Sequence, residues 1–121
     1  MELQRIEYDL SVCKIDDIKQ IDFSREFFVL SKTADEISLV CETDHIPPGA
    51  MASEHGWKAL KVAEVLDFGM IGVIAKISGI LAEAEISIFV VSTFNTDYML
   101  MKDKHFDKGV KALMRNGFLI R

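Results

Sequence analysis

The sequence predicts an α+β fold in which two amphipathic helices cover one face of an antiparallel sheet. Apolar residues at helical spacing indicate helices over Gly72–Ala84 and Lys104–Asn116, the second with Asp103 as its N-cap and Asn116-Gly117 at its end. Segments rich in β-branched and aromatic residues predict strands beside them. Together these elements have the order β-α-β-β-α-β in the C-terminal half, which is the ferredoxin-like order.

In the sequence, the four strands of this half are expected before, between and after the two helices. The turn-forming residues Asn95-Thr96-Asp97 separate the middle two strands as a hairpin connection would. The four expected strands are Leu60–Phe68, Ile86–Ser92, Tyr98–Lys102 and Phe118–Ile120.

The N-terminal half predicts a reduced version of the same fold. Its expected strands are Tyr8–Lys14, Glu26–Ser31 and Glu36–Glu42, with a closing strand over Trp57–Leu60. Short helices are expected over Asp16–Ile21 and after Pro47-Pro48-Gly49, over residues 50–55. We therefore expect two domains in tandem, residues 1–56 and residues 57–121.

An internal repeat supports this division. Sliding the chain by 61 positions places Phe28-Val29-Leu30-Ser31 on Phe89-Val90-Val91-Ser92 and Glu36 on Asp97. The two predicted hairpins coincide in this register, which favours a duplication.

Charge and composition exclude several classes of function. A net charge of −5 and a pI near 5.1 argue against nucleic acid and anionic membranes as partners. The chain has no apolar run long enough to span a bilayer and no signal-peptide pattern, so we expect a cytoplasmic protein. Cys13 and Cys41 lie far apart in apolar segments and are expected to be buried free thiols.

The segment Gly69-Met70-Ile71-Gly72 leads from a strand into the first predicted helix. Glycine allows backbone N–H groups to approach a ligand closely, and the helix dipole favours an anion there. A carboxylate could therefore bind at Met70, Ile71, Gly72 and Val73. The alternative is a tight connection that needs glycine for its backbone angles alone.

The hairpin residues Asn95, Thr96 and Asp97 offer acceptors for an ammonium group. The alternative is that they are ordinary turn residues with local side-chain to backbone bonds. No pattern predicts a metal, a cofactor or catalysis, because the three histidines lack ligand spacing and no nucleophile motif accompanies Ser53 and His55.

Residues 66–77, Leu-Asp-Phe-Gly-Met-Ile-Gly-Val-Ile-Ala-Lys-Ile, and residues 88–98, Ile-Phe-Val-Val-Ser-Thr-Phe-Asn-Thr-Asp-Tyr, resemble the ACT domain of small standalone bacterial proteins and of the CASTOR arginine sensors. The resemblance covers residues 57–121 and extends less closely over the N-terminal half. It implies a tandem ferredoxin-like regulatory protein that binds an amino acid through Met70 to Val73 and Asp97.

Two residues depart from the family pattern. Ile71 stands where the arginine sensors have an acidic residue, which puts arginine as the ligand in doubt, and Glu85 stands where relatives have glycine. We expect a non-catalytic, allosteric, amino-acid-sensing regulator that forms a homodimer or acts on a regulated protein partner. The alternative is a structural or protein-interaction module that keeps the ACT fold without a ligand.

Overall fold

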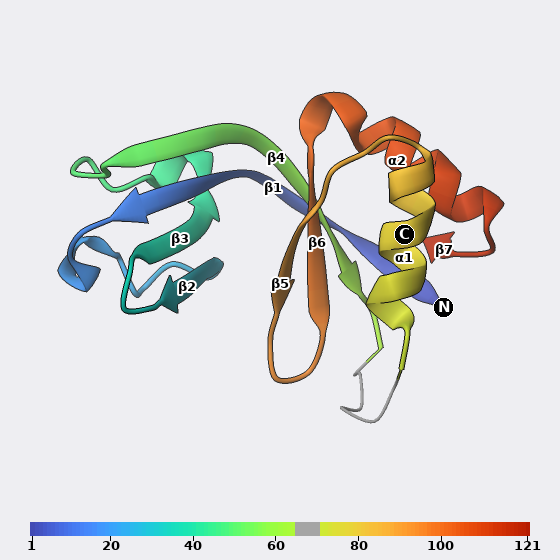
Figure 1. Cartoon of the computed structure of the whole chain (residues 1–121). Coiled ribbons are helices and arrows are strands. Elements are labelled where there is room, and N and C mark those ends of the chain that lie inside the picture. The colour runs from blue at the N-terminus through green and yellow to red at the C-terminus, as the bar shows by residue number, and fades with distance from the viewer. Residues whose placement is uncertain (65–70) are drawn as a thin grey trace. The chain divides into compact units, whose positions relative to one another are not determined.

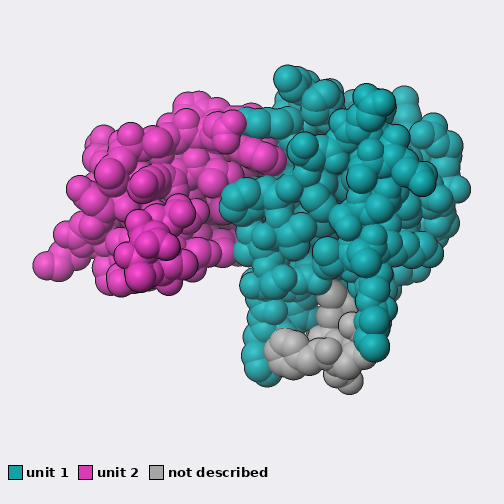
Figure 2. All heavy atoms as spheres, in the orientation of Figure 1, with its two compact units in different colours: residues 1–7, 58–121 teal, residues 8–57 magenta. Residues whose placement is uncertain are grey.

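The computed structural model describes residues 1–64 and 71–121, which form two compact units (Figure 2). Unit 1 holds residues 1–7 and 58–121, and unit 2 holds residues 8–57. The first seven residues thus belong to the unit that contains the C-terminal half. The expected domains, residues 1–56 and 57–121, remain a prediction about how the sequence is organised.

Unit 1 has a sheet with two helices packed on one face (Figure 1). Its strands, in spatial order, are β7, β1, β4, β6 and β5. The elements are β1 (Glu2–Ile15) and β4 (Ala52–Val62), each shared with unit 2, and α1 (Val73–Glu83), β5 (Phe89–Ser92), β6 (Asp97–Lys102), α2 (Asp103–Arg115) and β7 (Leu119–Ile120). From β4 onward the order is β-α-β-β-α-β, so the predicted α+β, ferredoxin-like class is confirmed.

The N-terminal end of β1 lies between β7 and β4, a position that the sequence did not predict. Leu3 pairs with Ile120 in the parallel β1–β7 ladder. On its other side, the Ala63 N–H donates to the Glu2 carbonyl at 3.0 Å. The inserted strand contributes Leu3, which is fully buried, to the core of unit 1.

The core of unit 1 forms between the helices and the sheet. Strand residues such as Met99 and helix residues such as Leu113 are both fully buried there. Burial of each such side chain stabilises the fold by about 1.5–3 kcal/mol relative to leaving it exposed. The buried members of this core are Leu3, Leu60, Val62, Ile77, Leu81, Ile86, Met99, Met101, Val110, Leu113, Phe118 and Ile120.

Both helices of unit 1 end in the same way, with a left-handed residue that satisfies the last carbonyls. After α2 this residue is Gly117, with φ of 92°, and the Phe118 N–H donates to the Leu113 carbonyl at 3.1 Å. After α1 it is Glu85, with φ of 62°. At its other end α2 begins with Asp103 as the first helical residue, so the prediction of Asp103 as N-cap was wrong by one position; the N-cap is Lys102.

Unit 2 contains the adjoining parts of β1 and β4 together with β2 (Phe28–Lys32) and β3 (Ile37–Glu42). Two single 3-10 turns, η1 (Ile18–Gln20) and η2 (Thr43–His45), replace the helices of unit 1. Its small apolar core consists of Cys13, Ile15, Ile21, Leu39 and Cys41.

The helix expected over residues 50–55 is wrong, because this segment enters β4. The Met51 N–H donates to the Lys14 carbonyl at 2.8 Å, which begins the pairing with β1. Residues 51–56 favour a helix by local propensity, but backbone pairing with β1 decides their conformation.

The two hairpins match at a spacing of 60 residues and not at the predicted 61. Lys32 pairs with Ile37 in unit 2, and Ser92 pairs with Asp97 in unit 1. The structural counterpart of Asp97 is therefore Ile37 and not Glu36. A one-residue slip moves every side chain to the other face of a strand, so the sequence identity over Phe28–Ser31 does not reflect matching positions.

Candidate functional site

The start of α1 presents unpaired backbone donors. Gly72 is the N-cap with φ of 83°, a left-handed conformation that favours glycine, and no side chain caps this end. The first helical hydrogen bond runs from the Lys76 N–H to the Gly72 carbonyl at 2.9 Å. The N–H groups of residues 73–75 therefore have no helical acceptor, and they carry the positive end of the helix dipole.

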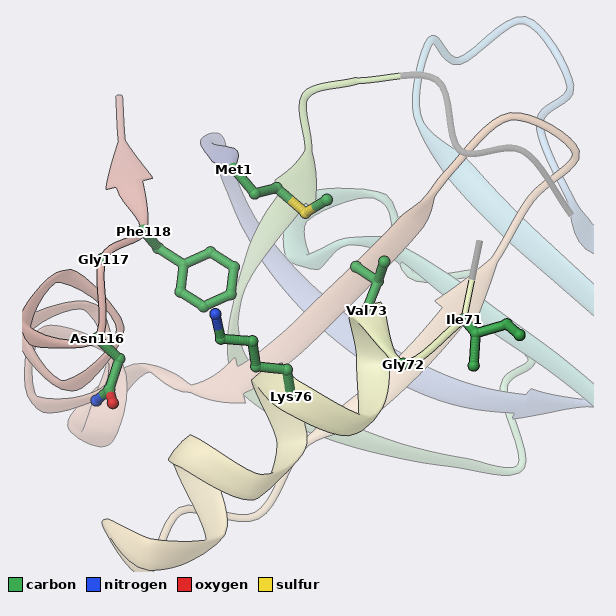
Figure 3. A pocket seen from close by; sticks show the side chains of 8 residues that line it. All are labelled: Met1, Ile71, Gly72, Val73, Lys76, Asn116, Gly117 and Phe118. Atoms are coloured by element: carbon green, nitrogen blue, oxygen red, sulfur yellow. The ribbon is translucent and has the colours of Figure 1, made fainter. Parts of the chain in front are cut away.

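A cavity of about 210 Å³ opens at this end of α1 (Figure 3). It lies between the first turn of α1 and the segment that joins α2 to β7. The described residues that line it are Met1, Ile71, Gly72, Val73, Lys76, Asn116, Gly117 and Phe118. Because a water molecule occupies about 30 Å³ of liquid, the space is large enough for a small metabolite.

The lining combines apolar walls with one positive charge. Figure 3 shows Met1, Val73 and the Phe118 ring around the same space. The Lys76 Nζ lies 5.3 Å from the centre of the Phe118 ring, a cation–π arrangement that holds the ammonium group at the cavity. None of the described lining residues is acidic. The cavity is therefore suited to an anionic group attached to an apolar body.

Ile71 lines this cavity, but its apolar side chain is exposed and not buried. Its side chain is 96% exposed, and Figure 3 shows it pointing away from Phe118 and Lys76. Gly72 and Val73 line the cavity as expected for residues at the start of the helix. Met70, the fourth residue predicted here, lies outside the described residues.

The second predicted cluster lies in the β5–β6 hairpin. Thr96 is buried, and its hydroxyl donates to the Val62 carbonyl at 2.8 Å. Asp97 is half-buried and accepts a 2.6 Å hydrogen bond from the Ser92 hydroxyl, while Asn95 is exposed. Thr96 is thus committed to joining the hairpin to β4, whereas Asp97 keeps carboxylate acceptor capacity for another donor.

The structure brings only part of the predicted site into one cavity. Ile71, Gly72 and Val73 line it, whereas the hairpin residues Asn95, Thr96 and Asp97 do not. The sequence analysis missed the following lining residues: Met1, Lys76, Asn116, Gly117 and Phe118. Helical spacing could have identified Lys76, because it follows Gly72 by one turn.

The cysteines are free thiols in the core of unit 2, as predicted. Burial is the main reason that the pKa of the Cys41 thiol rises to about 12, and burial also raises the pKa of Cys13. Both thiols are therefore protonated at neutral pH and poor nucleophiles. Within the described part of the chain, no group of three or more His, Cys, Asp or Glu residues could hold a metal ion.

A search of the helices in residues 1–64 and 71–121 finds none that is both long and apolar enough to cross a membrane.

A comparison with protein families finds that the model described as "ACT domain" matches residues 52–115. Among curated proteins, the chain is similar to subunit 1 of the cytosolic arginine sensor for mTORC1 of Homo sapiens, with 32% identity over 96 residues. The match covers 74% of this chain and 29% of the sensor, so the chain spans under a third of the length of this relative.

Solved structures show the same fold over nearly the whole chain. A protein from Agobacterium tumefaciens superposes with a TM-score of 0.87 at 25% identity, covering 99% of this chain and 91% of that one. The ligand-free regulatory subunit of aspartate kinase from Thermus thermophilus has a TM-score of 0.65 at 8% identity, covering 93% and 95% of the two chains. The second likeness concerns the fold alone.

Proposed function

Because the chain belongs to the ACT-domain family, we propose that it is a non-catalytic regulatory protein that senses an amino acid through unit 1. The observation that carries this proposal is the cavity at the start of α1, where unpaired helix N–H groups and a lysine surround a space of about 210 Å³. These groups suit a carboxylate. An arginine sensor among the similar proteins supports a regulatory role.

In this proposal the amino acid's carboxylate accepts hydrogen bonds from the backbone near Ile71, Gly72 and Val73. Asp97, with Asn95 or Thr96 beside it, holds the cationic group. Asp97 does not line the cavity. Both ends of one ligand are therefore satisfied together only if the hairpin reaches the ligand from a second copy of the chain, or if the ligand extends beyond the cavity.

The exposed edge of the sheet in unit 1 supports our proposal that the protein forms a homodimer. Strand β5 is at its edge, and Val90 on this strand is exposed. Edge strands carry unpaired backbone groups that proteins usually cover. We propose that ligand binding regulates this association or the binding of a regulated protein partner, in the cytoplasm.

A second candidate is a protein-interaction module that binds no small ligand. Two large apolar side chains in unit 1 favour it, because Ile71 is 96% exposed and Phe94, in the hairpin, is 80% exposed. Apolar side chains that are grouped on an exposed surface mark protein-interaction sites, and this candidate places both residues in such a contact.

A thermal-shift screen of the twenty amino acids against the intact protein separates these candidates. A ligand at about 100 times its dissociation constant should add roughly 2.7 kcal/mol of stability if it binds the native state alone. Asp97→Asn should remove most of this shift, because a lost charge-assisted hydrogen bond costs about 1.5–3 kcal/mol.

The matched control is Asp35→Asn, which changes a turn carboxylate in the β2–β3 hairpin of unit 2. It should leave the ligand-dependent shift unchanged. If no amino acid shifts the melt at millimolar concentration, sensing is excluded and the interaction module is favoured. If one does and Asp97→Asn binds it equally well, the assignment of Asp97 is wrong.

A further inference from the structure

The cavity at the start of α1 has one polar end and one apolar end. Its cation is Lys76, whose Nζ lies 5.3 Å from the centre of the Phe118 ring. Val73 and Met1 extend the apolar wall on the other side (Figure 3). The Lys76 ammonium group lies over the aromatic ring, and it keeps N–H donors that can reach a bound anion.

The charges that the described residues bring to the cavity have one sign. The positive end of α1 and the Lys76 ammonium both attract an anion. None of the described lining residues is acidic, so none of them compensates a buried cationic group. A ligand's ammonium or guanidinium would have to remain outside, in water or against a group that does not line the cavity.

We infer that the cavity selects small monocarboxylates with an apolar body, and that Lys76 is the residue that recognises the carboxylate. The apolar part of the ligand packs against Val73 and Phe118. This inference rests on the proposed sensing function and narrows it to a ligand class: amino acids with apolar side chains, whose carboxylate and apolar side chain occupy the cavity while the ammonium group lies outside it. Basic and acidic side chains are disfavoured.

Four probes test the ligand class by isothermal titration calorimetry on the intact protein. L-leucine should bind, and 4-methylpentanoate, which lacks the ammonium group proposed to contact Asp97, should lose no more affinity relative to leucine than leucine loses on Asp97→Asn. Leucinamide, which lacks the carboxylate, and L-arginine should each bind at least tenfold more weakly than leucine. These differences follow from the single-sign lining of the cavity.

Variants of Lys76 test the residue. Lys76→Met keeps an apolar stem against Phe118 and removes the charge, and it should weaken leucine binding at least tenfold. Lys76→Arg should stay within about threefold of the wild type. Lys111→Met, on the exposed face of α2, is the matched control and should bind leucine as the wild type does. Both positions are exposed, so the melting temperature of the three variants without ligand should differ little from that of the wild type.

The possible results separate this inference from the proposed function. Leucinamide binding as tightly as leucine, or Lys76→Met binding leucine normally, overturns the inference and leaves amino-acid sensing intact. If arginine binds in a way that depends on Asp97 and not on Lys76, the inference is also overturned and amino-acid sensing stands. If neither leucine nor 4-methylpentanoate binds the wild type, the inference is overturned, and the sensing function is rejected as well if none of the twenty amino acids binds.

Discussion

Units 1 and 2 each contain a similar β-hairpin, but the elements that cover the two hairpins differ. In each hairpin a threonine opens the turn, and its N–H donates to the carbonyl three residues later: Thr33 to Glu36 at 2.9 Å, and Thr93 to Thr96 at 2.8 Å. The second strands, β3 and β6, also have the same sequence of exposed and buried positions. The backbone design of the hairpin is therefore repeated.

The helices are not repeated. Unit 1 has α1 before its hairpin and α2 after it, where unit 2 has the single turns η1 and η2. The features proposed for ligand binding depend on this difference, because the cavity needs the start of α1 and the end of α2. In addition, unit 2 has Ile37 in the position of Asp97. The comparison supports the proposal that a ligand binds to unit 1, and we propose that unit 2 has a structural role.

The largest effect that tests this comparison is on the core beneath the helices. Leu113→Ala removes a fully buried side chain of α2 and should lower the free energy of unfolding by about 2–5 kcal/mol. Met114→Ala, one residue further along, removes a side chain that is 52% exposed and should cost under about 1 kcal/mol. Urea denaturation measures both. Equal losses would mean that α2 is not packed as described.

A smaller effect should appear at the two left-handed residues that flank α1. Glu85→Gly relieves a left-handed glutamate with φ of 62° and should stabilise the protein by about 1 kcal/mol. Gly72→Ala places a side chain at φ of 83° and should destabilise by about the same amount. Thermal denaturation without ligand measures both variants. Two changes of the same sign would contradict the backbone conformation on one side of α1.

The smallest effect concerns pH and the core of unit 2. Because burial raises the folded-state pKa of the Cys41 thiol to about 12 from its ordinary value of 9.0, the neutral thiol favours the native state. This contribution is complete below the unfolded pKa and is lost as the pH rises from about 9 towards 12. Stability should therefore fall over this range, and less steeply in Cys41→Ala. Urea denaturation at pH 8 and at pH 10.5 measures this fall in stability. An equal fall in the wild type and in Cys41→Ala would contradict the assignment of the effect to Cys41.

Helix and strand identities in unit 1 could be predicted because local signals agree with the packing there. Apolar spacing located α1 and α2 to within a residue or two, and Asn116-Gly117 located the end of α2. Glu85, which in the sequence stands where relatives have glycine, is left-handed in the structure. Local pattern and tertiary structure coincide in this unit.

The remaining features depend on contacts between distant parts of the chain. Residues 2–7 include only two apolar side chains, Leu3 and Ile6, and their place between β7 and β4 follows from pairing across more than fifty residues. Pairing of β4 with β1 likewise explains why residues 52–56 form a strand and not the expected helix. For the site, Gly72 and Val73 could be predicted from the loop and helix pattern, but Phe118 reaches the cavity only through the packing of α1 beside α2.

The most direct test of the central claim, that unit 1 alone carries the ligand, is a titration of the ¹⁵N-labelled protein with L-leucine followed by ¹H–¹⁵N correlation spectra. We expect the largest shift changes at the amides of residues 72–76 and 116–118, which surround the cavity. The turn of unit 2, residues 33–36, should be unaffected. Shift changes centred on that turn, or spread equally over both units, would contradict the account.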